Sequence, residues 1–146
     1  MTPLSAHFSL EEATTSQTAS RLGIDNDPTL DVVLNMKQAA LGMELVRQLL
    51  GQPIHINSWY RCPELNKAVG SKPTSDHITG FAVDFTCPTF GTPEKIVREI
   101  LKSNIDFKQV ILEFVTPTGG GWVHIAFNGM QRQALVINKD GVKVFA

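Results

Sequence analysis

The sequence predicts a single α+β domain spanning residues 1–146. In the first third of the chain, apolar residues recur at helical spacing, and in the second half they alternate along several short segments. Helices followed by mostly antiparallel strands are typical of a sheet with helices packed beside it. A hydrophobic content of 42% is ordinary for a globular protein of this length.

The first third is predicted to be helical. Ser9 and, three residues later, Glu12 form a capping box that begins a short helix, and residues 14–20 form a turn or a second short helix. A long helix is expected over about 28–50, where Gly51 ends it. Its apolar positions are interpreted as a core scaffold: Leu30, Val33, Leu34, Met36, Ala40, Leu41, Leu45, Val46, Leu49 and Leu50.

The remaining elements are short. A helix is expected over 63–69, and another begins at Pro93, with Thr92 as its cap, and runs to about residue 103. The predicted strands cover 54–59, 81–86, 110–115 and 122–127, with a final hairpin of 134–138 and 142–145.

Two of these strands place a polar residue opposite their apolar face. Alternation leaves Asp84 on the polar face of 81–86 and His124 on that of 122–127. His77 lies just before the strand 81–86. Gly80 stands between His77 and that strand and permits a tight approach of the backbone there. Two histidines and an aspartate are the ligand types of a catalytic zinc with one open position, so these three residues are the predicted metal ligands.

The ligands stand in the pattern Ser-x-His-x-x-Gly-x-Ala-x-Asp at 75–84, followed by Trp-x-His at 122–124. This pattern resembles the M15 family of zinc peptidases, which includes D-Ala-D-Ala carboxypeptidases, dipeptidases and L-alanyl-D-glutamate endolysins of phages. Residues 58–70 are similar to the family's Ser-x-Tyr-Arg-Ser-Pro-x-x-Asn segment, and 7–12 are similar to its single-domain phage and prophage members. The resemblance implies a Hedgehog/DD-peptidase-like fold, one Zn²⁺ per chain, and peptidoglycan stem peptides as substrate.

A metallopeptidase of this kind also needs a carboxylate that takes a proton from water. Many family members carry an acid a few positions before the last histidine, but this chain has three glycines at 119–121. Glu113 is the nearest acid upstream. If Val110, Leu112 and Phe114 face the core, Glu113 shares the face of His124 and is the predicted catalytic base. Asp76 is the alternative.

Arg61 is predicted to act in catalysis and in substrate binding, because its planar guanidinium suits a carboxylate or a polarised carbonyl oxygen. Peptidoglycan stems are rich in carboxylates. Ser75, Tyr60 and Trp122 are the other predicted substrate-binding residues, whereas His7 and His55 have no partner motif and are interpreted as non-ligands.

Two other functions remain open. A zinc-containing domain that has lost its base can serve as a peptidoglycan-binding module, and the Hedgehog signalling domain resembles these peptidases in fold. A D,D-dipeptidase or carboxypeptidase acting on small peptides is the other alternative. Glu113 is the feature that separates enzyme from module, and the sequence does not decide which bond is cut.

Composition restricts the partners. A net charge of −1 argues against nucleic-acid binding, and no stretch approaches the roughly 20 apolar residues of a membrane span. With no signal-peptide pattern, the protein is expected to be made in the cytoplasm and to reach the wall only if another factor releases it. Reduced thiols are expected at Cys62 and Cys87, and the chain is expected to be a monomer.

Overall fold

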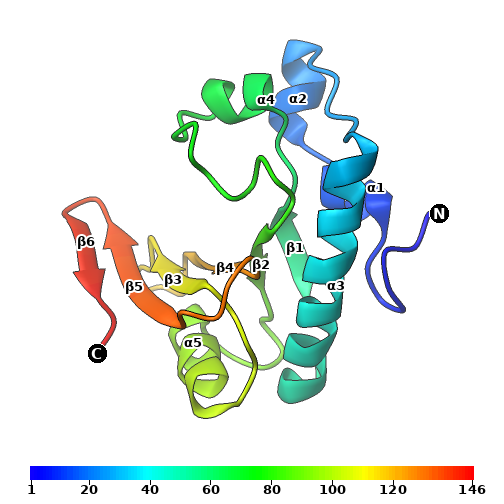
Figure 1. Ribbon diagram of the computed structural model, residues 1–146. Helices are drawn as coiled ribbons and strands as arrows, with labels where there is room; N and C mark the ends of the chain where they lie inside the picture. The colour runs from blue at the N-terminus through cyan, green and yellow to red at the C-terminus, as the bar shows by residue number, and fades with distance from the viewer.

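A computed structural model describes all 146 residues and contains one six-stranded sheet and five helices (Figure 1). The elements in chain order are α1 (Leu10–Thr14), α2 (Gln17–Leu22), α3 (Leu30–Leu50), β1 (His55–Ser58), α4 (Pro63–Ala68), β2 (Ala82–Thr86), α5 (Pro93–Lys102), β3 (Gln109–Glu113), β4 (Trp122–Ala126), β5 (Gln133–Asn138) and β6 (Gly141–Val144). The predicted α+β class is confirmed, and every predicted element is present with ends that differ by at most a few residues.

The strands lie in the order β1-β2-β4-β3-β5-β6. All neighbours are antiparallel except β3 and β5, which run parallel. The predicted final hairpin, β5–β6, is confirmed, and β3 and β4 form a second antiparallel hairpin. The parallel pairing of β3 with β5 was not predicted, because alternation identifies a strand but not its neighbour.

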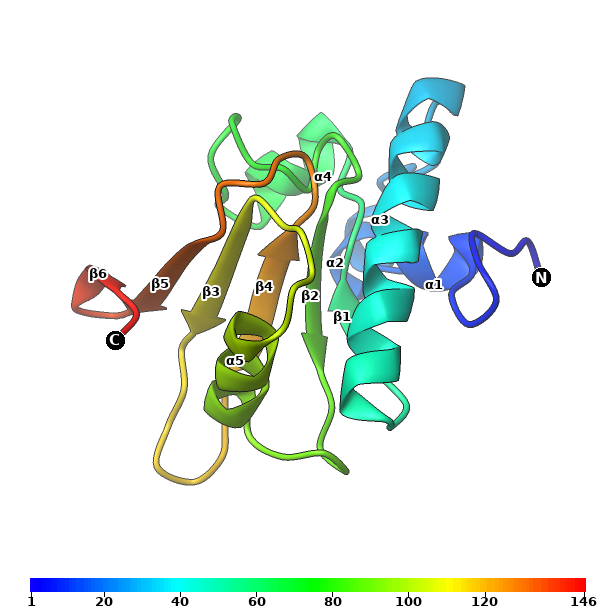
Figure 2. The ribbon, with the colours of Figure 1, turned by 60° about the horizontal axis from the view of Figure 1, so that its bottom comes forward.

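Helices α3 and α5 cover one face of the sheet, as Figure 2 shows for α5 in front of β3 and β4. Buried apolar side chains from both helices and from the inward positions of the strands form the core there. Burial of this face fixes the strand register, since a shift by one residue would turn the apolar set outward. The polar residues of β2, β3 and β4 are therefore left on the opposite face.

The core assignment along α3 is wrong at four positions. Leu30, Leu34, Leu41 and Leu45 are 73%, 51%, 64% and 50% exposed, whereas Met36 and Met43 are completely buried. Both sets recur at helical spacing, but they form stripes on different sides of the helix. Only one side of α3 can pack on the sheet, and helical periodicity alone could not decide which.

The predicted core position of Phe114 is also wrong. β3 ends at Glu113, and Phe114 has a positive φ of 53° and is 43% exposed. Its ring lies 5.5 Å from that of Trp122 across the β3–β4 hairpin. Gly121 closes this hairpin with a φ of 97°, and a Cβ there would come within 2.6 Å of the Glu113 carbonyl oxygen.

The predicted helix caps are confirmed. Ser9 and Glu12 form the capping box of α1, and the Thr92 side chain accepts a hydrogen bond from the backbone of Lys95 at the start of α5. Both cysteines are free thiols, Cys62 partly buried and Cys87 buried. None of the helices has the length and hydropathy required to cross a bilayer.

Candidate metal centre

Strands β2 and β4 bring Asp84 and His124 together. The two residues are directly paired in the antiparallel ladder, and Ile111 of β3 lies opposite His124 on its other side. Both side chains are buried on the face of the sheet away from α3 and α5. Alternation along the two strands therefore predicted the correct face for each residue.

The loop before β2 carries His77 to the same place. Gly80 has a φ of 85°, and a Cβ there would come within 2.7 Å of the Met36 side chain, so only glycine fits this close contact with α3. The indole N–H of Trp59 donates to the Gly80 carbonyl at 2.9 Å. These contacts hold the loop against the core just before the strand begins.

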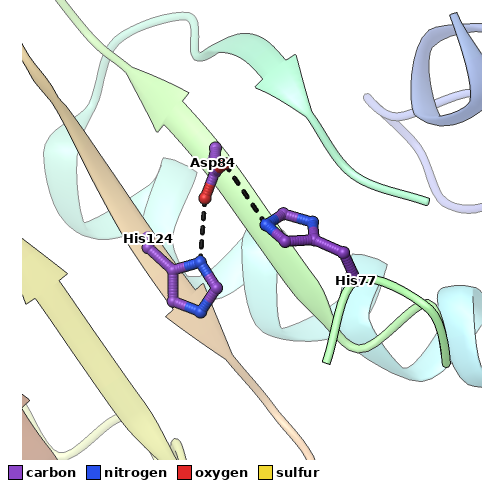
Figure 3. Close-up of side chains that lie close together, drawn as sticks. All are labelled: His77, Asp84 and His124. Carbon is purple, nitrogen blue, oxygen red and sulfur yellow. Dashed lines mark hydrogen bonds and ion pairs between the residues drawn. The ribbon is translucent and has the colours of Figure 1, made fainter. Parts of the chain in front are cut away.

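Figure 3 shows the Asp84 carboxylate between the two imidazoles. Its Oδ2 lies 3.2 Å from Nε2 of His77, and its Oδ1 lies 2.9 Å from Nδ1 of His124. One ligand atom from each residue falls within 4.8 Å of the others. The predicted ligand set thus converges on one buried point.

The orientation of His77 is set by the main chain. Its Nδ1 lies 2.5 Å from the Trp59 carbonyl oxygen, which can only accept, so Nδ1 carries the proton. In the neutral ring, Nε2 is then the nitrogen with a free lone pair, and it is the one directed at Asp84. Hydrogen bonding of the distal nitrogen to a carbonyl is the usual support of a metal-ligating histidine. This observation, together with the buried imidazole and carboxylate donors, fits Zn²⁺.

In the metal-free protein, the pKa values of Asp84 and His124 are shifted by burial and by each other's charge. Burial alone would raise the pKa of Asp84, but the positive charge that the two histidines can carry and the hydrogen bond from His124 hold that pKa well below its ordinary value. Burial would lower the pKa of His124, but the hydrogen bond and charge of Asp84 raise it overall. The cluster therefore favours a charged carboxylate between its two histidines.

Glu113 lies beside this cluster, as the alternation along β3 predicted. Its Oε1 is 3.6 Å from Nδ1 of His124. Burial, with the nearby charge of Asp84, raises the pKa of Glu113 to about 7. The buried indole N–H of Trp122, opposite Glu113 in the ladder, meets no acceptor within hydrogen-bonding geometry, although it lies close enough to favour the charged form of Glu113.

Arg61 contacts one of the candidate metal ligands. Its guanidinium lies 3.5 Å from Oδ2 of Asp84, 3.3 Å from Oδ1 of Asn66 and 3.3 Å from the Ser58 hydroxyl. Two of its five N–H groups remain for a ligand. Asn66, which orients the guanidinium from α4, was not singled out in the sequence.

A buried asparagine fixes the backbone that carries Arg61. Asn26 accepts a hydrogen bond from the Cys62 N–H at 2.8 Å and donates to the Tyr60 carbonyl at 3.1 Å. The Arg61 N–H in turn donates to the His77 carbonyl at 3.1 Å. Nothing in the sequence distinguishes Asn26 from an ordinary loop asparagine, because its partners are backbone groups of a distant segment.

The three candidate ligands line a cavity of about 300 Å³. Arg61, Ser75, Glu113 and Trp122 line the same cavity, so the structure brings together all predicted site residues but one. Tyr60 is buried and lines a neighbouring cavity instead. The Ser75 hydroxyl accepts a hydrogen bond from the His77 N–H at 3.2 Å.

Asp76, the alternative base, is held by two other residues. Its carboxylate lies 2.8 Å from the Lys108 ammonium and accepts a hydrogen bond from the Asn128 amide at 2.9 Å. The other two histidines lie apart from the centre: His7 bonds to Glu44 at 2.6 Å, and His55 is exposed on β1. Neither belongs to the group of candidate metal ligands.

Comparison with known proteins agrees with this site. The family model described as Peptidase M15 matches residues 6–126, a range that contains every residue of the metal centre and the proposed base. No curated protein sequence matches the chain.

Proposed function

Because the chain belongs to the peptidase M15 family of zinc-dependent peptidases, we propose that it hydrolyses an amide bond in peptidoglycan stem peptides or their cross-links. The DD-peptidase-like α+β fold agrees with this family. His77, Asp84 and His124 would hold the zinc ion. When bound there, zinc polarises the carbonyl of the scissile amide and makes water more acidic.

Glu113 performs the proton transfers in this proposal. Its carboxylate takes one proton from the attacking water and passes it to the leaving amine, so the amide and water yield a carboxylic acid and an amine. Arg61 binds a substrate carboxylate or the carbonyl oxygen on which negative charge develops. The Trp122 side chain lines the same cavity and can pack against the substrate.

The placement of Glu113 is the observation that supports an enzyme over a binding module. A module needs only the three ligands, but here a fourth titratable group lies 3.6 Å from a ligand and lines the same cavity. Perturbed carboxylates beside a metal site are typical of catalytic bases. The neighbouring Arg61 provides the anion-binding group that a peptidase also requires.

The test is to incubate the zinc-loaded protein with purified peptidoglycan and to identify the released fragments by mass spectrometry. New amino groups and defined peptide fragments are expected, and the fragment masses identify the bond that is cut. His124→Ala should lose both zinc and activity. Zinc binding and peptidoglycan binding without any new amine would instead establish the binding module, whereas turnover of free dipeptides alone would establish a small-peptide hydrolase.

A further inference from the structure

A second cavity, of about 570 Å³, adjoins the metal centre. Arg61 lines both cavities, so a ligand held at the metal can continue past its guanidinium into the second one. We call this second cavity the β1 trough. It lies between the segment 15–18 at the start of α2, strand β1 and the end of α4.

The outer edge of β1 faces this trough and α1, and no strand pairs with it. β1 is the first strand of the sheet and pairs only with β2, so the backbone N–H and C=O groups on its other side have no strand partner. All four residues of β1, His55–Ser58, line the trough. Neighbouring side chains such as those of His55 and Ile56 point to opposite faces, so a cavity that touches both meets the backbone edge itself. The register of β1 with β2 shifts between Ile56 and Ser58, which leaves Asn57 without a partner in β2.

The side chains around this edge are mostly uncharged hydrogen-bonding groups. The Ser16 hydroxyl accepts a hydrogen bond from the Ala19 N–H, and the Ser58 hydroxyl accepts one from the Arg61 guanidinium. Thr18 and Asn57 make no such bond, so their groups remain for a ligand. Glu12, His55 and Arg61 are the titratable residues of the lining, and Arg61 lies at the end next to the metal centre. The uncharged donors and acceptors between them suit main-chain amides.

We propose that the β1 trough binds an extended peptide segment of the substrate, which adds to the sheet as a strand alongside β1. This inference rests on the proposed peptidase function and adds the part of the substrate that lies beyond the cleaved bond. At about 3.3 Å per residue, the four residues of β1 match an extended peptide of about three to four residues. Pairing at an open strand edge is an established mode of peptide recognition. Continuity with the metal cavity at Arg61 makes the substrate peptide, and not an unrelated ligand, the occupant.

Filling the trough tests the proposal in the zinc-loaded enzyme. Thr18→Trp should raise KM at least tenfold for the free stem pentapeptide of peptidoglycan and leave kcat nearly unchanged. A dipeptide substrate, too short to pass Arg61, should show no change in KM. Ser20→Trp, an exposed site on the same helix outside the trough, is the matched control. Equal KM values for the two tryptophan variants would overturn the proposal.

Binding measured without turnover gives an independent result, and it does not depend on whether Thr18→Trp folds. In the ¹⁵N-labelled Glu113→Gln protein loaded with zinc, the pentapeptide should shift the backbone amide resonances of Thr18 and Asn57. Shifts confined to the loop around His77 would refute the trough while leaving the peptidase function intact. Shifts in the trough that require the attached disaccharide would assign it to glycan. If the protein neither binds nor cleaves any peptide, the proposed function and this inference both fail.

Discussion

At the scale of single residues, the site combines side chains that alternation can place with contacts that it cannot. Asp84, His124 and Glu113 lie where the period of two along their strands put them. The Trp59 carbonyl orients His77, and Asn26 binds the backbone N–H of Cys62. Both contacts join a side chain to a main-chain group that is distant in sequence. Sequence patterns encode faces of elements, so contacts between loops and backbone leave no pattern to read.

Glu113→Gln tests the proposed base. We expect a fall in kcat on peptidoglycan peptides of about a hundredfold or more, because general-base catalysis typically contributes 10²–10⁴-fold. Zinc content and fold should be retained, since Glu113 is not among the three ligands. Steady-state kinetics and elemental analysis of the same preparation provide the measurement. Full activity in Glu113→Gln would exclude Glu113 as the base.

The ion pair between Lys108 and Asp76 supports a second prediction at the residue scale. The Lys108 ammonium and the Asn128 amide bind the carboxylate of Asp76, which precedes the candidate ligand His77 in the chain. Lys108→Met leaves this largely buried carboxylate without its cation, so we expect a loss of roughly 1–3 kcal/mol in unfolding free energy. Zinc should also bind several-fold more weakly, as is common when groups behind a ligand are removed.

Chemical denaturation and competition with a zinc chelator measure these two effects. Lys143→Met on the exposed strand β6 is the control and should change neither. If Lys108→Met lowers stability but leaves zinc affinity unchanged, Asp76 holds the fold and does not position His77.

At the scale of elements, boundaries and caps were largely predictable, whereas neighbours and packed faces were not. The capping box at Ser9 and the Thr92–Pro93 start are local signals, and both helices begin there. β5 was found as a strand, but its parallel pairing with β3 depends on competition among strands for one sheet edge. In α3 two apolar stripes compete for the core, and the sequence contains no feature that ranks them.

Because α3 has a buried and an exposed apolar stripe, two nearby substitutions on this helix should differ in their effect on the free energy of unfolding. Met43→Ala should reduce the unfolding free energy by about 2–5 kcal/mol, because it opens a cavity under a completely buried side chain. Leu41→Gln should change it by no more than about 0.5 kcal/mol, because Leu41 is 64% exposed. Urea unfolding of both variants is the measurement. A large loss for Leu41→Gln would contradict the exposed position of this stripe.

At the scale of the whole molecule, the buried charges of the metal centre couple folding to pH and to zinc. In the metal-free protein, Asp84 has a lowered pKa, while Glu113 and His124 have raised ones. A lowered carboxyl pKa contributes stability that is lost as pH falls below the ordinary value of 3.8. The two raised values act in the other direction, so the metal-free protein should be most stable in mildly acidic solution.

The loss of stability at higher pH has a defined window. Between the ordinary pKa of 4.5 and the folded pKa of about 7, Glu113 holds a proton in the folded state that the unfolded chain has released, so stability declines as pH rises. The contribution of His124 is present below its ordinary pKa of 6.5 and is lost as pH rises through its raised folded value. Thermal unfolding in chelator should therefore show Tm falling from pH 5 to pH 8.

Zinc should reverse this trend. Its histidine ligands bind as neutral imidazoles, so zinc affinity, and with it the increase in Tm on adding zinc, should grow over the same range from pH 5 to pH 8. Glu113→Gln separates the two contributions, because it removes the Glu113 part of the metal-free decline but keeps all three ligands. We expect a shallower decline without zinc and an undiminished increase with it. A metal-free Tm that rises steadily from pH 5 to pH 8 would mean that Glu113 and His124 are not held in the buried, charge-coupled arrangement beside Asp84.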